Sequence, residues 1–202
     1  GTNGKTTTTT LTYEMIKEEG IRCHLAGNIG YPLCSFLDKL QKGDVIVMET
    51  SCQQLNNVKE FKPHIAVMTN LSEAHVDFFD NSYKKYKDVK TKIFKNQTKD
   101  DIAILNLEND EVLKQTKDIK SKKLYFSSKK KADCYLKDDI IYYNNEYKYV
   151  IQKDYEQEEY GIEYGAYLND ERIYKYSIEL EYEEDELEFS YSKKTNDDKL
   201  EI

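Results

Sequence analysis

The chain opens with the stretch Gly1-Thr2-Asn3-Gly4-Lys5-Thr6, which has the chemistry of a phosphate-binding loop. Glycines leave backbone N–H groups free to surround an anion, the lysine supplies a positive charge, and the threonine hydroxyl can bind Mg²⁺. A loop of this kind opens a helix and normally follows a buried strand. Because a Gly-Lys-Thr triplet also occurs by chance, the meaning of the stretch depends on the rest of the chain.

The sequence after the loop alternates between apolar runs and amphipathic segments. Three runs are apolar throughout and end on a polar residue, namely residues 45–48, 65–68 and 102–105. Such runs are typical of parallel strands covered on both faces. Strands that alternate with helices predict an α/β fold with a mostly parallel sheet and right-handed crossovers. The other expected elements are helices over residues 5–19, 32–40 and 82–96 and strands over residues 21–26 and 124–126.

The pattern changes after Asp133, where short segments alternate between apolar and polar residues. Alternation of this kind is typical of antiparallel strands joined by hairpins. We therefore expect three parts: an α/β domain over residues 1–132 that lacks the strand before the loop, antiparallel β hairpins over residues 133–192, and a disordered end over residues 193–202.

The formal net charge of −8 is unevenly distributed along the chain. From Asp154 onward there are 17 acidic and 5 basic residues, whereas residues 1–153 carry 25 basic and 21 acidic ones. The first part can therefore hold anionic phosphates. Neither part has the dense basic stripe of a nucleic-acid-binding protein, so we expect no nucleic-acid partner.

No apolar run is long enough to cross a membrane, and no signal peptide is visible. We expect a cytoplasmic, monomeric protein that does not bind a membrane. The four cysteines have no metal-binding spacing, which favours reduced thiols at Cys23, Cys34, Cys52 and Cys134.

Polar residues follow the apolar runs at the carboxyl edge of the predicted sheet, where ligands of open parallel sheets bind. Glu49 follows the first run, residues 70–77 follow the second, and Asn106 follows the third. A strand-end carboxylate is usually just a solvated residue. Beside a phosphate loop, Glu49 becomes a candidate Mg²⁺ ligand, because nucleotide phosphates bind together with Mg²⁺. His75, taken alone, is more often a surface or helix-capping residue than a ligand.

Four ordered motifs resemble those of the Mur ligase family. The opening stretch through Thr7 is similar to the family's ATP loop, and residues 27–32 (Gly-Asn-Ile-Gly-Tyr-Pro) resemble a turn of the member that adds D-glutamate to UDP-N-acetylmuramoyl-L-alanine. Residues 49–55 resemble that member's Glu-x-Ser-Ser-Phe-Gln-Leu segment. Residues 70–77, residues 86–90 and Asn106 resemble its next block in order and spacing. The resemblance covers residues 1 to about 150.

The resemblance implies an ATP-dependent amide ligase of peptidoglycan precursor synthesis, with ATP and Mg²⁺ as cofactors and UDP-N-acetylmuramoyl-L-alanine and D-glutamate as substrates. It implies catalytic roles for Lys5, His75 and Lys90. It implies ATP contacts for Gly1, Thr2, Asn3, Gly4, Lys5, Thr6, Thr7 and Asn106. Substrate contacts are implied for Asn28, Ser51, Gln54 and His75, and metal contacts for Thr6, Glu49, His75 and Lys90, the last as a carbamate.

The sequence departs from the family's pattern at several positions. Cys52 and Gln53 stand where Ser-Phe is common, Ala74 where many members have Asp, and Phe79 where many have His. After about residue 152 there is no Gly-x-His-Asn segment. Three alternatives stay open: a nucleotide-binding domain without ligase activity of its own, another amide ligase of the family such as a folylpolyglutamate synthase or an isoglutaminyl-forming partner subunit, and an unrelated P-loop NTPase.

Overall fold

The computed structural model describes residues 1–74, 76–138, 140–143, 147–153, 160–168, 171–183 and 186–195. The chain divides into two compact units, Gly1–Leu124 and Tyr125–Ile202. His75, a predicted site residue, lies outside the described residues. Residues 193–195 of the expected disordered end belong to the last strand, and residues 196–202 also lie outside the described part.

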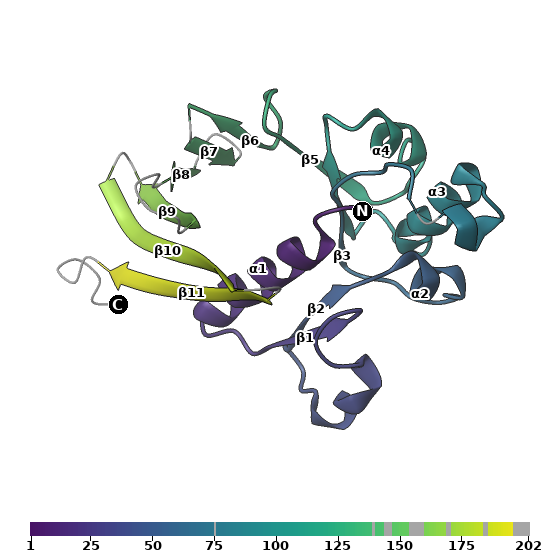
Figure 1. The fold of residues 1–202 in the computed structure, drawn as a ribbon, viewed down its shortest axis with the longest axis horizontal. Coiled ribbons are helices and arrows are strands. Elements are labelled where there is room, and N and C mark those ends of the chain that lie inside the picture. Colours follow the sequence, from purple (N-terminus) through teal and green to yellow (C-terminus); the bar gives the residue numbers. More distant parts are fainter. Residues whose placement is uncertain are drawn as a thin grey trace. The chain divides into compact units, whose positions relative to one another are not determined.

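The first unit alternates strands with helices, as Figure 1 shows. The α-helices are α1 (Lys5–Glu18), α2 (Cys52–Asn56), α3 (Tyr83–Thr91) and α4 (Asp110–Gln115). The strands are β1 (Cys23–Gly27), β2 (Val45–Glu49), β3 (Ile65–Met68) and β4 (Ile102–Asn106), and β5 (Lys122–Ser127) begins in this unit. Short 3₁₀ turns cover Leu33–Ser35, Leu37–Lys39, Val76–Phe79 and Lys92–Phe94.

The strands of the first unit pair in parallel. β1 pairs with β2 from Cys23↔Val45 to Gly27↔Glu49, and β3 pairs with β4 from Ile65↔Ile102 to Met68↔Leu105. In the described part of the chain these are separate ladders, because β2 pairs only with β1 and β3 only with β4. The predicted α/β fold with a mostly parallel sheet is confirmed.

Local sequence signals explain where the helices begin. The Ser51 hydroxyl accepts the N–H of Gln54 while the Gln54 side chain accepts the N–H of Ser51, a capping box that starts α2. Ser82 caps α3 in the same way by accepting the N–H of Lys85. The buried faces of α2 and α3 then meet in an apolar cluster of Cys52, Leu55, Phe79, Tyr86 and Val89.

The prediction of one helix over residues 32–40 was wrong. Two 3₁₀ turns occupy this stretch, and Phe36 between them leaves the helical conformation with φ −142°. Its ring is buried and stacks on the ring of His24 at a centroid distance of 5.2 Å. Packing of this ring therefore takes precedence over local helix formation.

The helix predicted over residues 82–96 is shorter than expected. It ends at Thr91 and continues as a 3₁₀ turn to Phe94. Asn96 then donates from Nδ2 to the carbonyl oxygens of Lys59, at 2.8 Å, and Phe61, at 3.0 Å. These hydrogen bonds fix the chain in a non-helical path after the turn.

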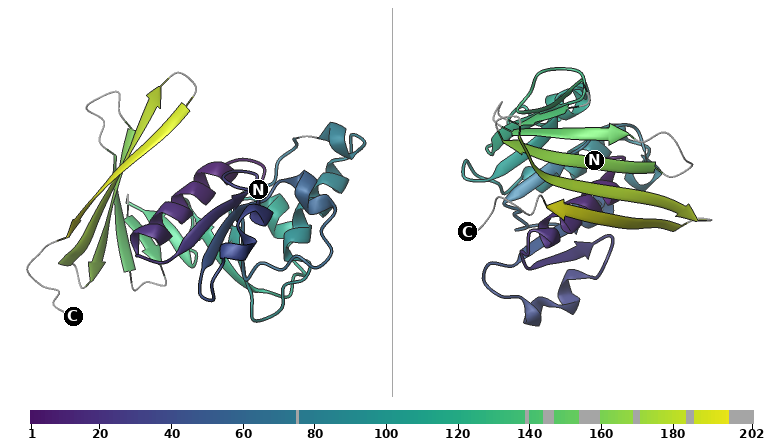
Figure 2. Two further views of the ribbon diagram at one scale, coloured as in Figure 1. Left: turned by 90° about the horizontal axis from the view of Figure 1, so that it is seen from below. Right: turned by 90° about the vertical axis from the view of Figure 1, so that its left-hand side faces the viewer.

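The second unit is a succession of antiparallel strands, in agreement with the predicted β appendage. They are β6 (Cys134–Lys137), β7 (Ile140–Tyr143), β8 (Tyr147–Lys153), β9 (Tyr160–Leu168), β10 (Glu171–Glu183) and β11 (Glu186–Thr195). Each pairs with the next in antiparallel register, and Figure 2 shows β9, β10 and β11 side by side. The end of β5 pairs with β6 in parallel.

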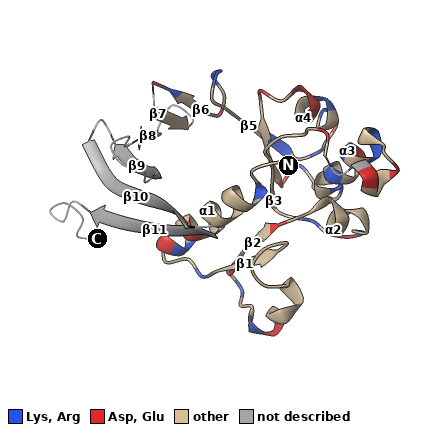
Figure 3. Cartoon of the chain, in the orientation of Figure 1, with Lys and Arg blue, Asp and Glu red and all other residues tan. Residues whose placement is uncertain are grey.

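Acidic and basic residues are interspersed along α3 (Figure 3). Lys84 pairs with Asp88, and Lys87 pairs with Glu111 of α4. The Lys84–Asp88 pair, four residues apart and exposed, is typical of a solvated helix face. All four cysteines are free thiols. None of the helices in the described ranges combines the length and hydropathy that a membrane crossing requires.

Candidate functional site

The predicted phosphate loop leads directly into α1. Gly4 is the N-cap residue of this helix and has the left-handed backbone conformation, with φ 74°, that glycine adopts most easily. No side chain caps the helix. The first N–H groups of an α-helix have no acceptor within the helix, and they carry the positive end of its dipole. Since Gly4, Thr6 and Thr7 are exposed, these donors are open to an anion from solvent.

Two lysines stand beside the loop. Lys5 donates from Nζ to the carbonyl oxygen of Thr2 at 2.9 Å, and Lys90 of α3 donates from Nζ to the carbonyl oxygen of Gly1 at 2.6 Å. Both ammonium groups therefore rest on carbonyl oxygens of the loop itself. An incoming phosphate offers a stronger, charged acceptor, so Lys5 can move onto it by giving up one hydrogen bond to a neutral carbonyl oxygen.

Lys90 is a buried cation, with only 4% of its surface exposed. Its Nζ lies 4.9 Å from the centre of the Tyr86 ring. The pKa of Lys90 is lowered to about 8, mainly by burial and also by the positive charge of Lys5, whereas Cys52 and Glu49 act in the opposite direction. Part of the Lys90 population is thus a neutral amine at mildly alkaline pH, the form that reacts with CO₂ to give a carbamate.

Glu49 presents a buried carboxylate at the carboxyl end of β2, with 2% of its surface exposed. Its Oε2 accepts the hydroxyl of Thr6 at 2.7 Å, and its Oε1 accepts Nδ2 of Asn28 at 2.9 Å. Asn28 can approach because Gly27 precedes it: a Cβ on Gly27 would lie 2.1 Å from the carbonyl oxygen of Glu49. Three separate stretches of sequence therefore meet at one carboxylate.

Thr6 and Glu49 together offer a hydroxyl and a carboxylate oxygen. This pair fits Mg²⁺, which is usually bound by one or two carboxylates with water and phosphate oxygens completing its shell. Among the described residues there is no cluster of three or more His, Cys, Asp or Glu side chains that could enclose a metal ion. The donor set thus suits a nucleotide-bound cation better than an all-protein metal site.

Three other predicted site residues use their side chains within the protein. Ser51 and Gln54 form the capping box of α2. Asn106 donates from Nδ2 to the carbonyl oxygen of Thr69 at 2.9 Å and accepts the N–H of Glu108 at Oδ1 at 2.8 Å. The structure does not bring these three side chains onto the phosphate loop directly.

Sequence reasoning missed the residues that hold the loop. The hydroxyl of Thr2 donates to the carbonyl oxygen of Ser72 at 3.1 Å and lies 3.0 Å from the hydroxyl of Tyr86, which is fully buried. Asn70 contacts Asn3 with both ends of its side-chain amide. Tyr86 and Asn70 both lie in the quoted motifs, so their position was visible in the sequence, but their loop contacts span 67 to 84 residues.

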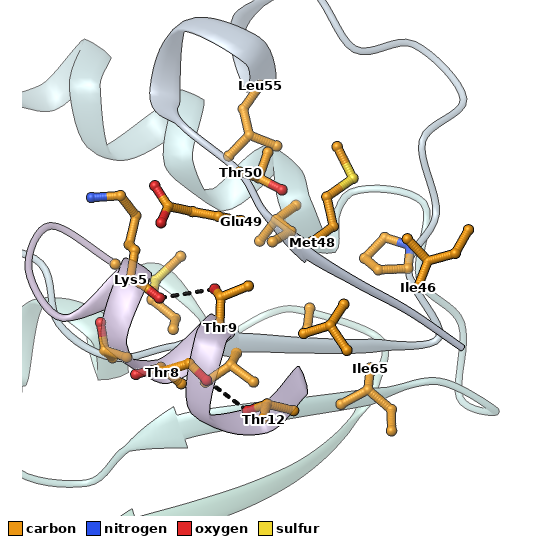
Figure 4. A pocket seen from close by; sticks show the side chains of 18 of the residues that line it. Lys5, Thr8, Thr9, Thr12, Ile46, Met48, Glu49, Thr50, Leu55 and Ile65 are labelled. Carbon is orange, nitrogen blue, oxygen red and sulfur yellow. Dashed lines mark hydrogen bonds between the residues drawn. The ribbon is translucent and has the colours of Figure 1, made fainter. Parts of the chain in front are cut away.

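A groove of about 260 Å³ runs from the loop between β2 and β3 (Figure 4). Helix α1 borders it with Thr8, Thr9 and Thr12; Thr9 and Thr12 turn their hydroxyls onto helix carbonyl oxygens four residues earlier. In Figure 4 the side chains of Lys5 and Glu49 extend toward the same end of the groove. The groove is thus polar at the phosphate loop and apolar along the strands.

The sequence model of the Mur ligase middle domain matches residues 1–170. The UDP-N-acetylmuramoylalanine–D-glutamate ligases of Staphylococcus aureus strains JH9 and Newman are 40% identical to the chain over 144 residues, which is 71% of the chain and 32% of each ligase. The chain therefore spans about a third of the curated relatives it matches.

Solved structures of MurF ligases share the fold. The Thermotoga maritima enzyme in complex with ADP superposes with a TM-score of 0.57 at 20% identity, covering 89% of this chain and 38% of that one. The Acinetobacter baumannii enzyme superposes with a TM-score of 0.55 at 14% identity, covering 89% of this chain and 37% of that one.

Proposed function

Because the chain belongs to the Mur ligase family through its middle domain, we propose that it is the ATP-binding part of the ligase that joins D-glutamate to UDP-N-acetylmuramoyl-L-alanine. The observation that carries this proposal is the convergence of Lys5, Glu49 and Lys90 on an open phosphate loop. The identity with the staphylococcal D-glutamate ligases supports the choice of substrates. The product would be a peptidoglycan precursor, made in the cytoplasm.

In the proposed reaction, an oxygen of the substrate's alanyl carboxylate attacks the γ-phosphorus of ATP. The bond from this phosphorus to the β,γ-bridging oxygen breaks, and ADP leaves with the electron pair. The amino nitrogen of D-glutamate then attacks the carbon of the acyl phosphate, inorganic phosphate leaves, and the nitrogen loses a proton as the amide forms. Fixed positive charge and N–H donors lower the barrier because negative charge builds on phosphate oxygens.

The residues of this chain have distinct parts in that scheme. The open N–H groups from Gly4 to Thr7 would surround the β- and γ-phosphates, and Lys5 would balance their charge after leaving Thr2. Thr6 and Glu49 would hold Mg²⁺, which supplies further neutralisation of the phosphates. Lys90, as a carbamate, and His75 would hold a second cation. The lowered pKa of Lys90 supports carbamylation, because the reaction needs the neutral amine.

The sugar-nucleotide substrate would lie against Asn28, Ser51 and Gln54. Asn28 supports this placement most strongly, because its bond to Glu49 puts it beside the loop. Ser51 and Gln54 would contribute through the fixed N-terminus of α2. Asn106 would support ATP by fixing Thr69. A panel of carboxylate acceptors and amino acids would distinguish this ligase from another amide ligase of the family.

The direct test uses the full-length protein with Lys5→Ala. We expect ATP-dependent ligation of D-glutamate to be abolished, because the loop loses its charge toward the γ-phosphate. Lys99→Ala removes an exposed lysine elsewhere and should leave ligation unchanged. Ligation retained by Lys5→Ala would refute the assignment.

A second candidate is nucleotide binding without ligation by this chain on its own. The match covers 32% of each staphylococcal ligase, so nucleotide binding by the isolated chain should be tested separately from ligation. Isothermal titration of the chain with ATP and Mg²⁺ should give saturable binding. Heat of binding without amide formation would support the second candidate for the isolated chain, and no binding would exclude both candidates for it.

A further inference from the structure

Asn70, directly after β3, grips the backbone of the phosphate loop. Its Oδ1 accepts the N–H of Asn3 at 2.9 Å, and its Nδ2 donates to the carbonyl oxygen of Asn3 at 3.0 Å. A peptide N–H can only donate and a carbonyl oxygen can only accept, so the two partners define the orientation of the amide. One side chain thus satisfies both backbone groups of a loop residue 67 positions away.

Hydrogen bonds of neighbouring groups reinforce the contact between Asn70 and the loop. Thr69 donates from its hydroxyl to the carbonyl oxygen of Asn3 at 2.8 Å, and Thr2 donates its N–H to the carbonyl oxygen of Asn70 at 2.9 Å. Two adjacent loop residues are therefore tied to two adjacent residues at the end of β3. These hydrogen bonds end at Asn3, immediately before Gly4, where the backbone enters α1.

Two further asparagines fix the residues on either side of Asn70. Asn109, the N-cap residue of α4, accepts the N–H of Leu71 and donates to its carbonyl oxygen, both at 3.3 Å. Asn106 donates to the carbonyl oxygen of Thr69. The residues on either side of Asn70 are thus fixed from β4 and α4, which leaves the amide of Asn70 little freedom to move away from the loop.

We propose that Asn70 is a positioning residue that presets the phosphate loop for the anion. This inference rests on the proposed nucleotide-binding function. Helix α1 has no side-chain cap and Asn3 is exposed, so the backbone at Asn3 needs a constraint against competing water from outside the helix. Asn70 supplies that constraint from a distance, and a loop ordered before binding does not lose its conformational entropy when the phosphate arrives.

The hydrogen bonds of Asn70 also determine which N–H groups of the loop are left for phosphate. Because the N–H of Asn3 is already bound to Asn70, the groups left for phosphate begin at Gly4. Asn70 acts through the loop and does not need to touch the nucleotide. Substitution of Asn70 should therefore weaken nucleotide binding, whereas its effect on the melting temperature should be similar to that of losing two hydrogen bonds away from the loop.

The test compares Asn70→Leu with Asn96→Leu in this chain. Asn96 is a matched control, because its half-buried side chain also donates two hydrogen bonds to distant carbonyl oxygens, away from the loop. The melting temperature and the affinity for ADP and Mg²⁺ by titration calorimetry are measured for each. We expect both variants to lower the melting temperature to a similar degree, and only Asn70→Leu to weaken ADP affinity, by about tenfold or more.

Asn70→Asp is the milder variant if Asn70→Leu does not fold. Its carboxylate still accepts the N–H of Asn3 but cannot donate to the carbonyl oxygen, so ADP affinity should fall as well. Equal ADP affinity in the Asn70 variants, Asn96→Leu and the unaltered chain would overturn the inference. Absence of ADP binding in the unaltered chain would instead count against the proposed function, so the two failures are distinguishable.

Discussion

At the scale of single residues, Glu49 is the clearest candidate for a metal ligand. Its buried carboxylate accepts hydrogen bonds from the neutral side chains of Thr6 and Asn28, and among the described residues no Lys, Arg or His forms a salt bridge with it. Glu49→Gln keeps the size of the side chain and removes the charge that would bind Mg²⁺. We expect the fold to be kept and the affinity for ATP to lose its dependence on Mg²⁺.

Calorimetry with ATP in Mg²⁺ and in EDTA checks this prediction. Glu111→Gln is a suitable control, because Glu111 pairs with Lys87 and Lys114 away from the loop. If Glu49→Gln binds ATP with the same Mg²⁺ enhancement as the unaltered chain, Glu49 is not a metal ligand.

Lys90 makes a prediction about pH. Its pKa is lowered from 10.5 to about 8 by folding, so the unfolded chain binds more protons between these values. The free energy of unfolding should therefore rise as the pH is raised from 8 to 10.5, and the penalty of the buried charge should be fully present below pH 8. The size of the change is about 2 to 3 kcal/mol at roughly 1.4 kcal/mol per pKa unit.

Urea unfolding at about pH 7 and about pH 10, on either side of this range, measures the change. Lys90→Met removes the titrating group, so its stability relative to the unaltered chain should be greater at the lower pH than at the higher one. Lys92→Met, which alters a lysine bound to the carbonyl oxygen of Asn56, gives the background from other titrating groups. The same difference for both variants would mean that Lys90 does not carry a depressed pKa.

At the scale of elements, the positions of β2, β3 and β4 could be read from the sequence because each is built on a continuous apolar run. The conformation of residues 32–40 could not be read in this way, because it depends on a contact with another element. Phe36 packs on His24 of β1, and no local pattern encodes that stacking. Ser51 and Gln54, predicted as substrate contacts, form the capping box that starts α2, and that signal is local in the sequence.

The Phe36 contact predicts a measurable difference between neighbours. Phe36 is 8% exposed, whereas Leu37 is 54% exposed. Phe36→Ala should therefore reduce the free energy of unfolding by about 3 kcal/mol, and Leu37→Ala by less than about 1 kcal/mol. Urea denaturation of the two variants checks this. Equal losses would show that the ring of Phe36 contributes no more than an exposed side chain.

At the scale of the whole molecule, the site was predictable in its parts. The motifs predict Lys5, Glu49 and Lys90 at one edge of the sheet, and in the structure all three side chains form hydrogen bonds with the phosphate loop. The hydrogen bonds that orient them join residues up to 89 positions apart, and a single sequence carries no signal for such pairings. Pattern identifies the chemistry of the loop, whereas its rigidity depends on tertiary contacts such as those of Asn70.

The separation of the two parallel ladders yields the last prediction. Alternate residues of a parallel strand bond to opposite neighbours. Val45 bonds to β1 and the carbonyl oxygen of residue 64 bonds to β4, so the backbone groups of Ile46, Met48, Ile65 and Val67 face the groove between β2 and β3.

Helix α1 covers this groove but buries none of its own residues, and Ile46, Ile65 and Val67 are partly exposed there at 38%, 53% and 36%. If the chain is extended ahead of Gly1 by one strand, we expect that strand to fill the groove and to run parallel to β2 and β3 into Gly1. Edge groups of this kind are otherwise open to unwanted pairing.

Hydrogen–deuterium exchange of the two forms tests this arrangement. In the longer form, the amides of Ile46, Met48, Ile65 and Val67 should exchange much more slowly than in the present chain, because ladder hydrogen bonds protect them. The amide of Val45, already bonded to β1, is the internal control and should change little. Equal exchange at the four groove amides in both forms would exclude a strand between β2 and β3.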